Sequence, residues 1–142
     1  MEPTATSRTM ARRDLLLLLA AMLVPVLVLR LTLHASPDLD LDVAGHNVPH
    51  LFTGLLLVSL GGIPLALLRR EGPWRRPALA AFGGGLGLAL DEWVYLIVTD
   101  GSNASYLLPV SLWGAVVVLG LASAYALLLA LRDGRSGGRP AN

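Results

Sequence analysis

Residues 15–29 read LLLLLAAMLVPVLVL, an uncharged stretch that is long enough to begin a membrane span. Three further apolar stretches follow, at about residues 48–68, 78–98 and 106–131. A helix that crosses the bilayer core needs about 20 apolar residues, at a rise of about 1.5 Å per residue. Helices also satisfy every backbone polar group internally, which hydrocarbon requires. The sequence therefore predicts an all-α membrane protein, in which four antiparallel transmembrane helices form one bundle.

The composition agrees with this fold class. Of the 142 residues, 54% are hydrophobic and 15% are charged, whereas a soluble domain carries about 25% charged residues. We expect a tail at residues 1–13, a four-helix domain at 14–131 whose first span covers about 14–35, and a second tail at 132–142. The net charge of +1 argues against a nucleic-acid-binding protein. The absence of cysteine excludes disulfides, cysteine-ligated zinc and thiol catalysis.

The distribution of arginine predicts the orientation in the membrane. All eleven basic residues are arginine, and apart from Arg30 they lie in the two tails and in the connection at residues 69–76. The other two connections carry acidic residues instead, namely Asp38, Asp40, Asp42 and Asp100. The positive-inside rule therefore predicts that both termini are cytoplasmic.

The same arginine-rich, lysine-free composition is typical of a GC-rich bacterial genome, so we expect a bacterial cytoplasmic (inner) membrane protein. Arg12 and Arg13 before a leucine run also resemble a signal peptide, with a weak cleavage site near Ala35. Removing the first span would reverse the arginine pattern of the remainder, so an uncleaved helix is the favoured interpretation.

Ionisable side chains inside the spans are the candidate functional residues, because each costs about 2.5–3.5 kcal/mol at the centre of a membrane helix. The third span enters from the cytoplasm near Pro77, so Asp91 lies about 20 Å along it, in the outer half of the bilayer. Groups from two other helices reach this same layer. The six groups of the layer are Arg30, His34, His46, His50, Asp91 and Glu92.

Imidazole and carboxylate groups in this pattern suggest a divalent-metal site. His50, Asp91 and Glu92 are the predicted ligands, with His46 as a further one, and zinc, iron, manganese or copper would suit them. The alternative is a charge-compensated layer that fixes helix packing, in which Arg30 pairs with a carboxylate and His34 assists. A proton or cation conduit is a third interpretation. Since adjacent helical residues point about 100° apart, Asp91 and Glu92 are expected to have different partners.

Glycines predict where the helices approach one another. Gly54 lies one turn after His50 on the same helix face, and Gly84 and Gly87 share a face with Asp91. Small residues of this kind permit close contact between membrane helices. The aromatic residues lie mostly near span ends and are interpreted as an interfacial belt, formed by Trp74, Trp93, Tyr95, Tyr106 and Trp113.

Three functions from different classes follow from these patterns. The first is a metal-binding or metal-dependent site that faces the outer side, for binding or for hydrolytic or redox chemistry. The second is an accessory subunit or assembly factor of a larger membrane complex, whose polar cluster is structural. The third is the proton or cation conduit. The lipid bilayer is the expected partner in each case, together with other membrane subunits or further copies of the chain, and enzymatic activity is left open.

Overall fold

The computed structural model describes residues 5–36, 42–43, 46–47, 50–68, 72–100 and 103–136, and the side chains within 10–36, 50–68, 72–100 and 105–132. It contains the long helices α1 (Ala5–Ala35), α2 (His50–Leu67), α3 (Arg75–Val98) and α5 (Pro109–Ser136). Each is long and apolar enough to cross a membrane. The prediction of a helical membrane protein with four spans is therefore confirmed at the level of helix length and composition.

Two small elements accompany the long helices. The four-residue helix α4 (Asn103–Tyr106) precedes α5. Strands β1 (Asp42–Val43) and β2 (His46–Asn47) pair antiparallel, with Asp42 opposite Asn47. The sequence patterns did not indicate this two-residue ladder, because a strand so short has no periodicity to detect.

The helix bounds differ from the predicted spans at several ends. Helix α1 begins at Ala5 and α5 extends to Ser136, so parts of both predicted tails are helical. Residues such as alanine, methionine and arginine favour helix, which lets the spans continue beyond the hydrocarbon. The last long helix begins at Pro109 rather than near residue 106, since proline is favoured in the first turn, where its missing N–H needs no partner.

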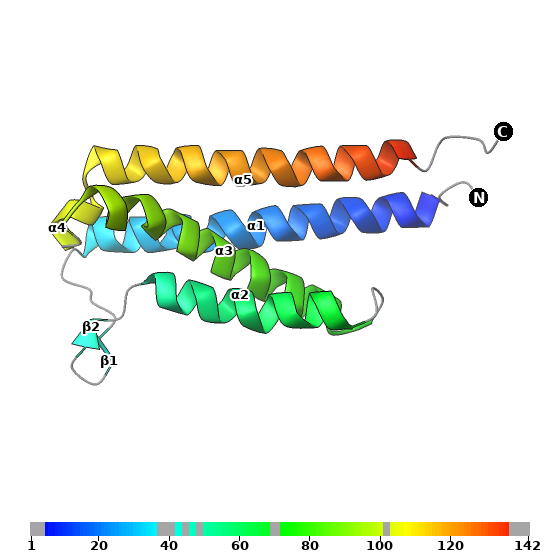
Figure 1. The fold of residues 1–142 in the computed structure, drawn as a ribbon, viewed down its shortest axis with the longest axis horizontal. Coiled ribbons are helices and arrows are strands. Elements are labelled where there is room, and N and C mark those ends of the chain that lie inside the picture. Colours follow the sequence, from blue (N-terminus) through cyan, green and yellow to red (C-terminus); the bar gives the residue numbers. More distant parts are fainter. Residues whose placement is uncertain are drawn as a thin grey trace.

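Helix α3 is the central element of the arrangement. It packs against α2 most extensively and also against α1 and α5. Figure 1 shows α3 crossing obliquely from α2 towards α5, while α1 and α5 run side by side. The first turns of α1 and the last turns of α5 lie at the same end of the molecule (Figure 1). Any polar side chain on the buried faces of α3 can therefore reach partners on three helices.

Glycine allows α3 to approach its neighbours at backbone distance. A Cβ atom at Gly54 of α2 would lie 2.7 Å from the carbonyl oxygen of Gly85 on α3, and one at Gly87 would overlap the carbonyl oxygen of Met22 on α1. Gly84 differs, because a Cβ there would lie 3.6 Å from its nearest neighbour, the carbonyl oxygen of Ala21, in ordinary contact. Gly54 and Gly87 therefore lie at tight helix contacts, whereas Gly84 has room for a methyl group.

Apolar side chains cover the outside of the bundle. The buried apolar cluster lies between α1 and α5 and contains Met22, Val26, Ala115 and Leu119. Large side chains on the outer faces stay exposed, for example Leu27 (59%), Leu56 (60%) and Leu121 (66%). So much exposed apolar surface would be unfavourable in water. The outer surface of the bundle therefore fits a lipid environment.

Candidate functional site: a buried cluster around Asp91

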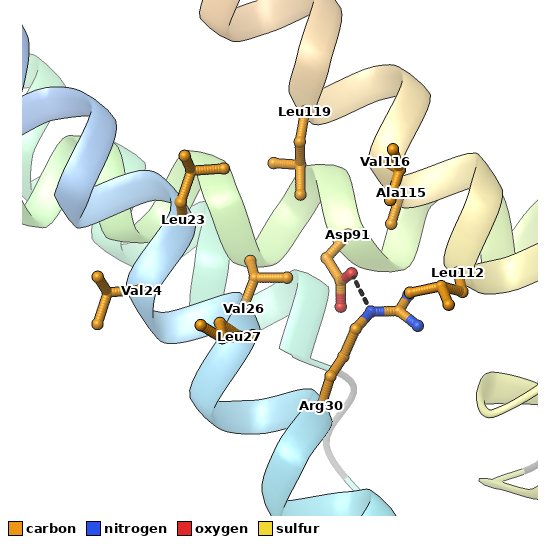
Figure 2. A pocket seen from close by; sticks show the side chains of 10 residues that line it. All are labelled: Leu23, Val24, Val26, Leu27, Arg30, Asp91, Leu112, Ala115, Val116 and Leu119. Atoms are coloured by element: carbon orange, nitrogen blue, oxygen red, sulfur yellow. Dashed lines mark hydrogen bonds and ion pairs between the residues drawn. The ribbon is translucent and has the colours of Figure 1, made fainter.

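Asp91 lies in the middle of the polar cluster, on the face of α3 between α1 and α5. Only 1% of the residue is exposed. The Nε atom of Arg30, on α1, donates a hydrogen bond to its Oδ1 at 2.7 Å, and Figure 2 shows the two side chains meeting. The hydroxyl of Tyr106 donates to its Oδ2. Both carboxylate oxygens of Asp91 are therefore held by protein donors.

Arg30 extends the cluster to α5. Its Nη2 atom donates to the Ser111 carbonyl oxygen at 3.3 Å and to the Ser111 hydroxyl at 3.2 Å. The central carbon of its guanidinium lies 4.6 Å from the ring centroid of Tyr106, within the range of a cation–π contact. One arginine thus contacts α3, α4 and the first turn of α5.

Tyr106 and Ser111 are members of the cluster that the sequence patterns did not indicate. Tyr106 is 6% exposed and packs edge-on against Tyr95, with ring centroids 5.2 Å apart and an interplanar angle of 88°. Its hydroxyl is the donor in the hydrogen bond to Asp91. The belt interpretation is wrong for Tyr95 and Tyr106, which are buried, although Trp93 and Trp113 are exposed.

A signal for Tyr106 was nevertheless present in the sequence. The residue begins the fourth predicted span, in the same predicted layer as Arg30 and Asp91. Tyrosine carries an O–H donor that needs a partner when the ring is buried. A buried acid at the same depth, here Asp91, is such a partner.

Glu92 has a different role from its neighbour. It is 5% exposed, and its Oε2 accepts a hydrogen bond from the backbone N–H of Leu51, in the first turn of α2. The first N–H groups of a helix have no partner within the helix, and a carboxylate is favoured at this positive end of the helix dipole. Glu92 therefore joins α3 to α2. The prediction that Asp91 and Glu92 have different partners is confirmed.

The histidines are distributed less compactly than the acids. His50 begins α2 and is half-buried, beside the residue that Glu92 contacts. His34 is exposed near the end of α1. The side chain of His46 falls outside the described side chains, although its backbone forms part of β2. Among the described side chains, it is Arg30 that forms an ion pair with Asp91.

Within the described residues, no group of three or more His, Asp or Glu side chains could hold a metal ion. The predicted metal site of His46, His50, Asp91 and Glu92 stays a prediction. Both oxygens of Asp91 already accept hydrogen bonds from protein donors.

A second ion pair joins α1 to α3 near the other end of the bundle. There the Nη2 atom of Arg75 lies 2.9 Å from Oδ2 of Asp14.

An open cavity adjoins the cluster. It has a volume of about 330 Å³ and is lined by residues of α1 and α5, Arg30 among them, together with Asp91 of α3. Figure 2 shows its apolar walls, formed by side chains such as Leu23, Leu27, Leu112 and Leu119, beside the ion pair.

The chemistry of the cluster is that of a satisfied polar network. Every fully buried side-chain nitrogen or oxygen in the described part of the chain has a hydrogen-bond partner. Such a network fixes the relative positions of α1, α2, α3 and α5. No family model, curated protein or solved structure matches this chain.

Proposed function

We propose that this chain is an accessory subunit or assembly factor of a larger membrane complex, with a polar cluster that serves a structural purpose. In this proposal the four helices are antiparallel, both termini are cytoplasmic and the cluster lies in the outer half of the bilayer. The arginine distribution supports this orientation. Helix length and the exposed apolar side chains support residence in a bilayer.

One observation carries the structural role of the cluster: the buried carboxylates are engaged by donors from other helices. Asp91 accepts from Arg30 and Tyr106, and Glu92 accepts from the backbone of α2. A carboxylate that acts as a general base or as a metal ligand needs a free lone pair aimed at its target. Asp91 is 1% exposed and each of its oxygens faces a donor from another helix, which favours a locking contact over acid–base chemistry.

A locking contact has a physical purpose in a membrane. Helices gain little hydrophobic free energy from associating in lipid, so polar contacts and close packing decide which faces meet. Two unpaired charges in hydrocarbon are costly, so the arrangement of α1 against α3 that pairs Arg30 with Asp91 is strongly favoured. The bundle then presents fixed outer faces to its surroundings.

Helix α2 offers one such face. Four large apolar residues recur at helical spacing along its outer side, each close to 60% exposed: Phe52 (60%), Leu56 (60%), Leu60 (59%) and Ile63 (58%). Spacings of three and four residues put them on one stripe. This stripe is available to lipid or to a helix of another subunit, and the accessory role uses it as the contact surface.

Native mass spectrometry of the protein, extracted in polymer nanodiscs without detergent, tests this proposal. We expect one defined assembly that contains a second membrane protein in fixed stoichiometry. The double variant Arg30→Leu/Asp91→Leu, which removes both charges, should retain that assembly if the cluster is only structural. Recovery of this chain without any second protein would contradict the accessory role. A double variant that is stable but no longer joins the assembly would contradict a purely structural role of the cluster.

A further inference from the structure

The cavity between α1 and α5 combines apolar walls with a charged end. Apart from Arg30 and Asp91, the residues that line it are apolar, and its volume is about 330 Å³. Ligand pockets in proteins begin at about 300 Å³, so this one has room for a narrow ligand. Leu23 and Arg30 are seven positions apart on α1, which corresponds to about 10 Å along the helix axis. The lining of the cavity therefore extends over about 10 Å of α1.

Arg30 lines this cavity, and its guanidinium has unused donor capacity. Its Nε and Nη2 atoms donate to Asp91 and Ser111, and within the described residues Nη1 forms no hydrogen bond. Every fully buried side-chain nitrogen in this part of the chain has a partner, so Nη1 must retain accessible surface. In a membrane-spanning segment an accessible guanidinium N–H needs an acceptor from outside the protein.

The position of Arg30 limits where that acceptor comes from. The residue lies five positions before the end of α1 at Ala35, about 7.5 Å along the helix. Long arginine side chains at such depths reach towards the headgroup layer. Guanidinium groups match the geometry of phosphate oxygens better than other cations do. A phospholipid is the one molecule abundant at this depth that supplies both a phosphate and an apolar chain.

We infer that the α1–α5 cavity binds a phospholipid from the outer leaflet, with one acyl chain along the cavity and a phosphate oxygen that accepts a hydrogen bond from Arg30. The Arg30–Asp91 pair remains intact in the bound state, since the lipid uses only the Nη1 atom. This inference concerns a different face of the bundle from the α2 stripe, so it does not depend on the accessory role, and only its choice of leaflet rests on the proposed orientation.

Two neighbouring valines on α5 provide matched variants. Val116 lines the cavity and is 50% exposed, whereas Val117 does not line it and is 57% exposed. Val116→Phe should fill the cavity, and Val117→Phe should add the same bulk to the lipid-facing surface. On α1, Val24 lines the cavity and Val28 does not, and both are 55% exposed. Val24→Phe and Val28→Phe form a second pair, for use if Val116→Phe does not fold.

The experiment titrates delipidated protein in detergent with dioleoyl phosphatidylglycerol and counts bound lipid by native mass spectrometry. Dioleoylglycerol, which has the same chains but no phosphate, is the comparison lipid. We expect one tightly bound phosphatidylglycerol per chain in the native protein and in Val117→Phe. Val116→Phe should bind it at least about tenfold more weakly, a difference of about 1.4 kcal/mol.

Several results would overturn the inference. Equal binding by Val116→Phe and Val117→Phe would mean that lipid only coats the outer surface. Equal affinity for phosphatidylglycerol and dioleoylglycerol would mean that the phosphate does not contribute to binding, which would contradict its contact with Arg30. A dimer that excludes lipid, and that Val116→Phe converts to monomer, would show that a second copy of the chain occupies the cavity.

Discussion

The Nε atom of Arg30 lies 2.7 Å from Oδ1 of Asp91, although the two residues are 61 positions apart in the chain. Their side chains are 13% and 1% exposed, so water solvates neither charge fully. Separated in hydrocarbon, each charge would carry the full insertion cost, whereas together each offsets part of the other's cost. This contact therefore determines which face of α1 meets which face of α3.

Removing the arginine alone should be strongly destabilising. We expect Arg30→Leu to lower the free energy of unfolding by about 3–5 kcal/mol, because it leaves Asp91 buried without its counter-ion. The double variant Arg30→Leu/Asp91→Leu should recover much of this loss, since no charge then remains. Unfolding in mixed detergent and denaturant micelles measures both values.

The ion pair at the other end of the bundle is the control for this comparison. Arg75 and Asp14 have side chains 32% and 24% exposed, so solvent screens their attraction and Asp14→Asn should cost about 0–1 kcal/mol. If Arg30→Leu and its double variant were equally unstable, the Arg30–Asp91 contact would not couple the helices.

The hydroxyl of Tyr106 should contribute measurably to stability. Tyr106→Phe keeps the ring that packs on Tyr95 but removes the donor to Asp91, so we expect a loss of about 1–3 kcal/mol. Tyr125→Phe is the matched control, because Tyr125 is 64% exposed on α5 and should change unfolding by less than about 0.5 kcal/mol. Equal effects of the two substitutions would show that the Tyr106 hydroxyl does not support Asp91.

Two glycines on α3 should respond differently to the same added methyl group. Gly87→Ala brings a Cβ onto the Met22 carbonyl oxygen, so we expect it to destabilise the bundle by about 1–3 kcal/mol through overpacking. Gly84→Ala places its Cβ 3.6 Å from the nearest atom and should be neutral or slightly stabilising, since alanine favours helix over glycine. Thermal melting of both variants in one detergent tests this order. A reversed order would mean that α1 and α3 do not approach at Gly87.

Metal content distinguishes the structural cluster from the predicted metal site. If Asp91 and Glu92 are held by protein donors alone, treatment with EDTA should leave the melting temperature unchanged. The Asp91→Asn variant should then bind as little zinc as the native protein does. A stoichiometric metal in elemental analysis, lost together with stability on chelation and absent from Asp91→Asn, would instead establish the site of His46, His50, Asp91 and Glu92.

The predicted orientation can be tested by cysteine labelling, because the chain contains no cysteine. A cysteine at Ser102, in the third connection, should react with a membrane-impermeant maleimide added to intact cells. A cysteine at Gly72, in the arginine-rich connection, should react only after the membrane is opened. Labelling of Gly72→Cys from outside would contradict the four-span orientation.

The local features of the fold could be predicted from particular residues. The leucine-rich stretch at residues 15–29 and the other apolar stretches are long enough to require helices, because the backbone must satisfy itself in lipid. Counting along the helices also brought Arg30 and Asp91 to one depth, since helical rise is constant. The exact ends at Ala5 and Pro109 were harder to predict, because helices extend into water according to weak local preferences.

Four helices that are long and apolar enough to cross a membrane can be recognised from the amino-acid sequence alone, and so can the costly polar groups that they carry. The contacts of Arg30 and Tyr106 with Asp91, and of Glu92 with the start of α2, arise only when the helices pack together. The physical reason is that depth along a helix follows from sequence position, whereas the rotation of each helix about its axis depends on its neighbours. Close contacts at glycines and the pairing of buried charges determine that rotation. Both exist only once the helices have packed together.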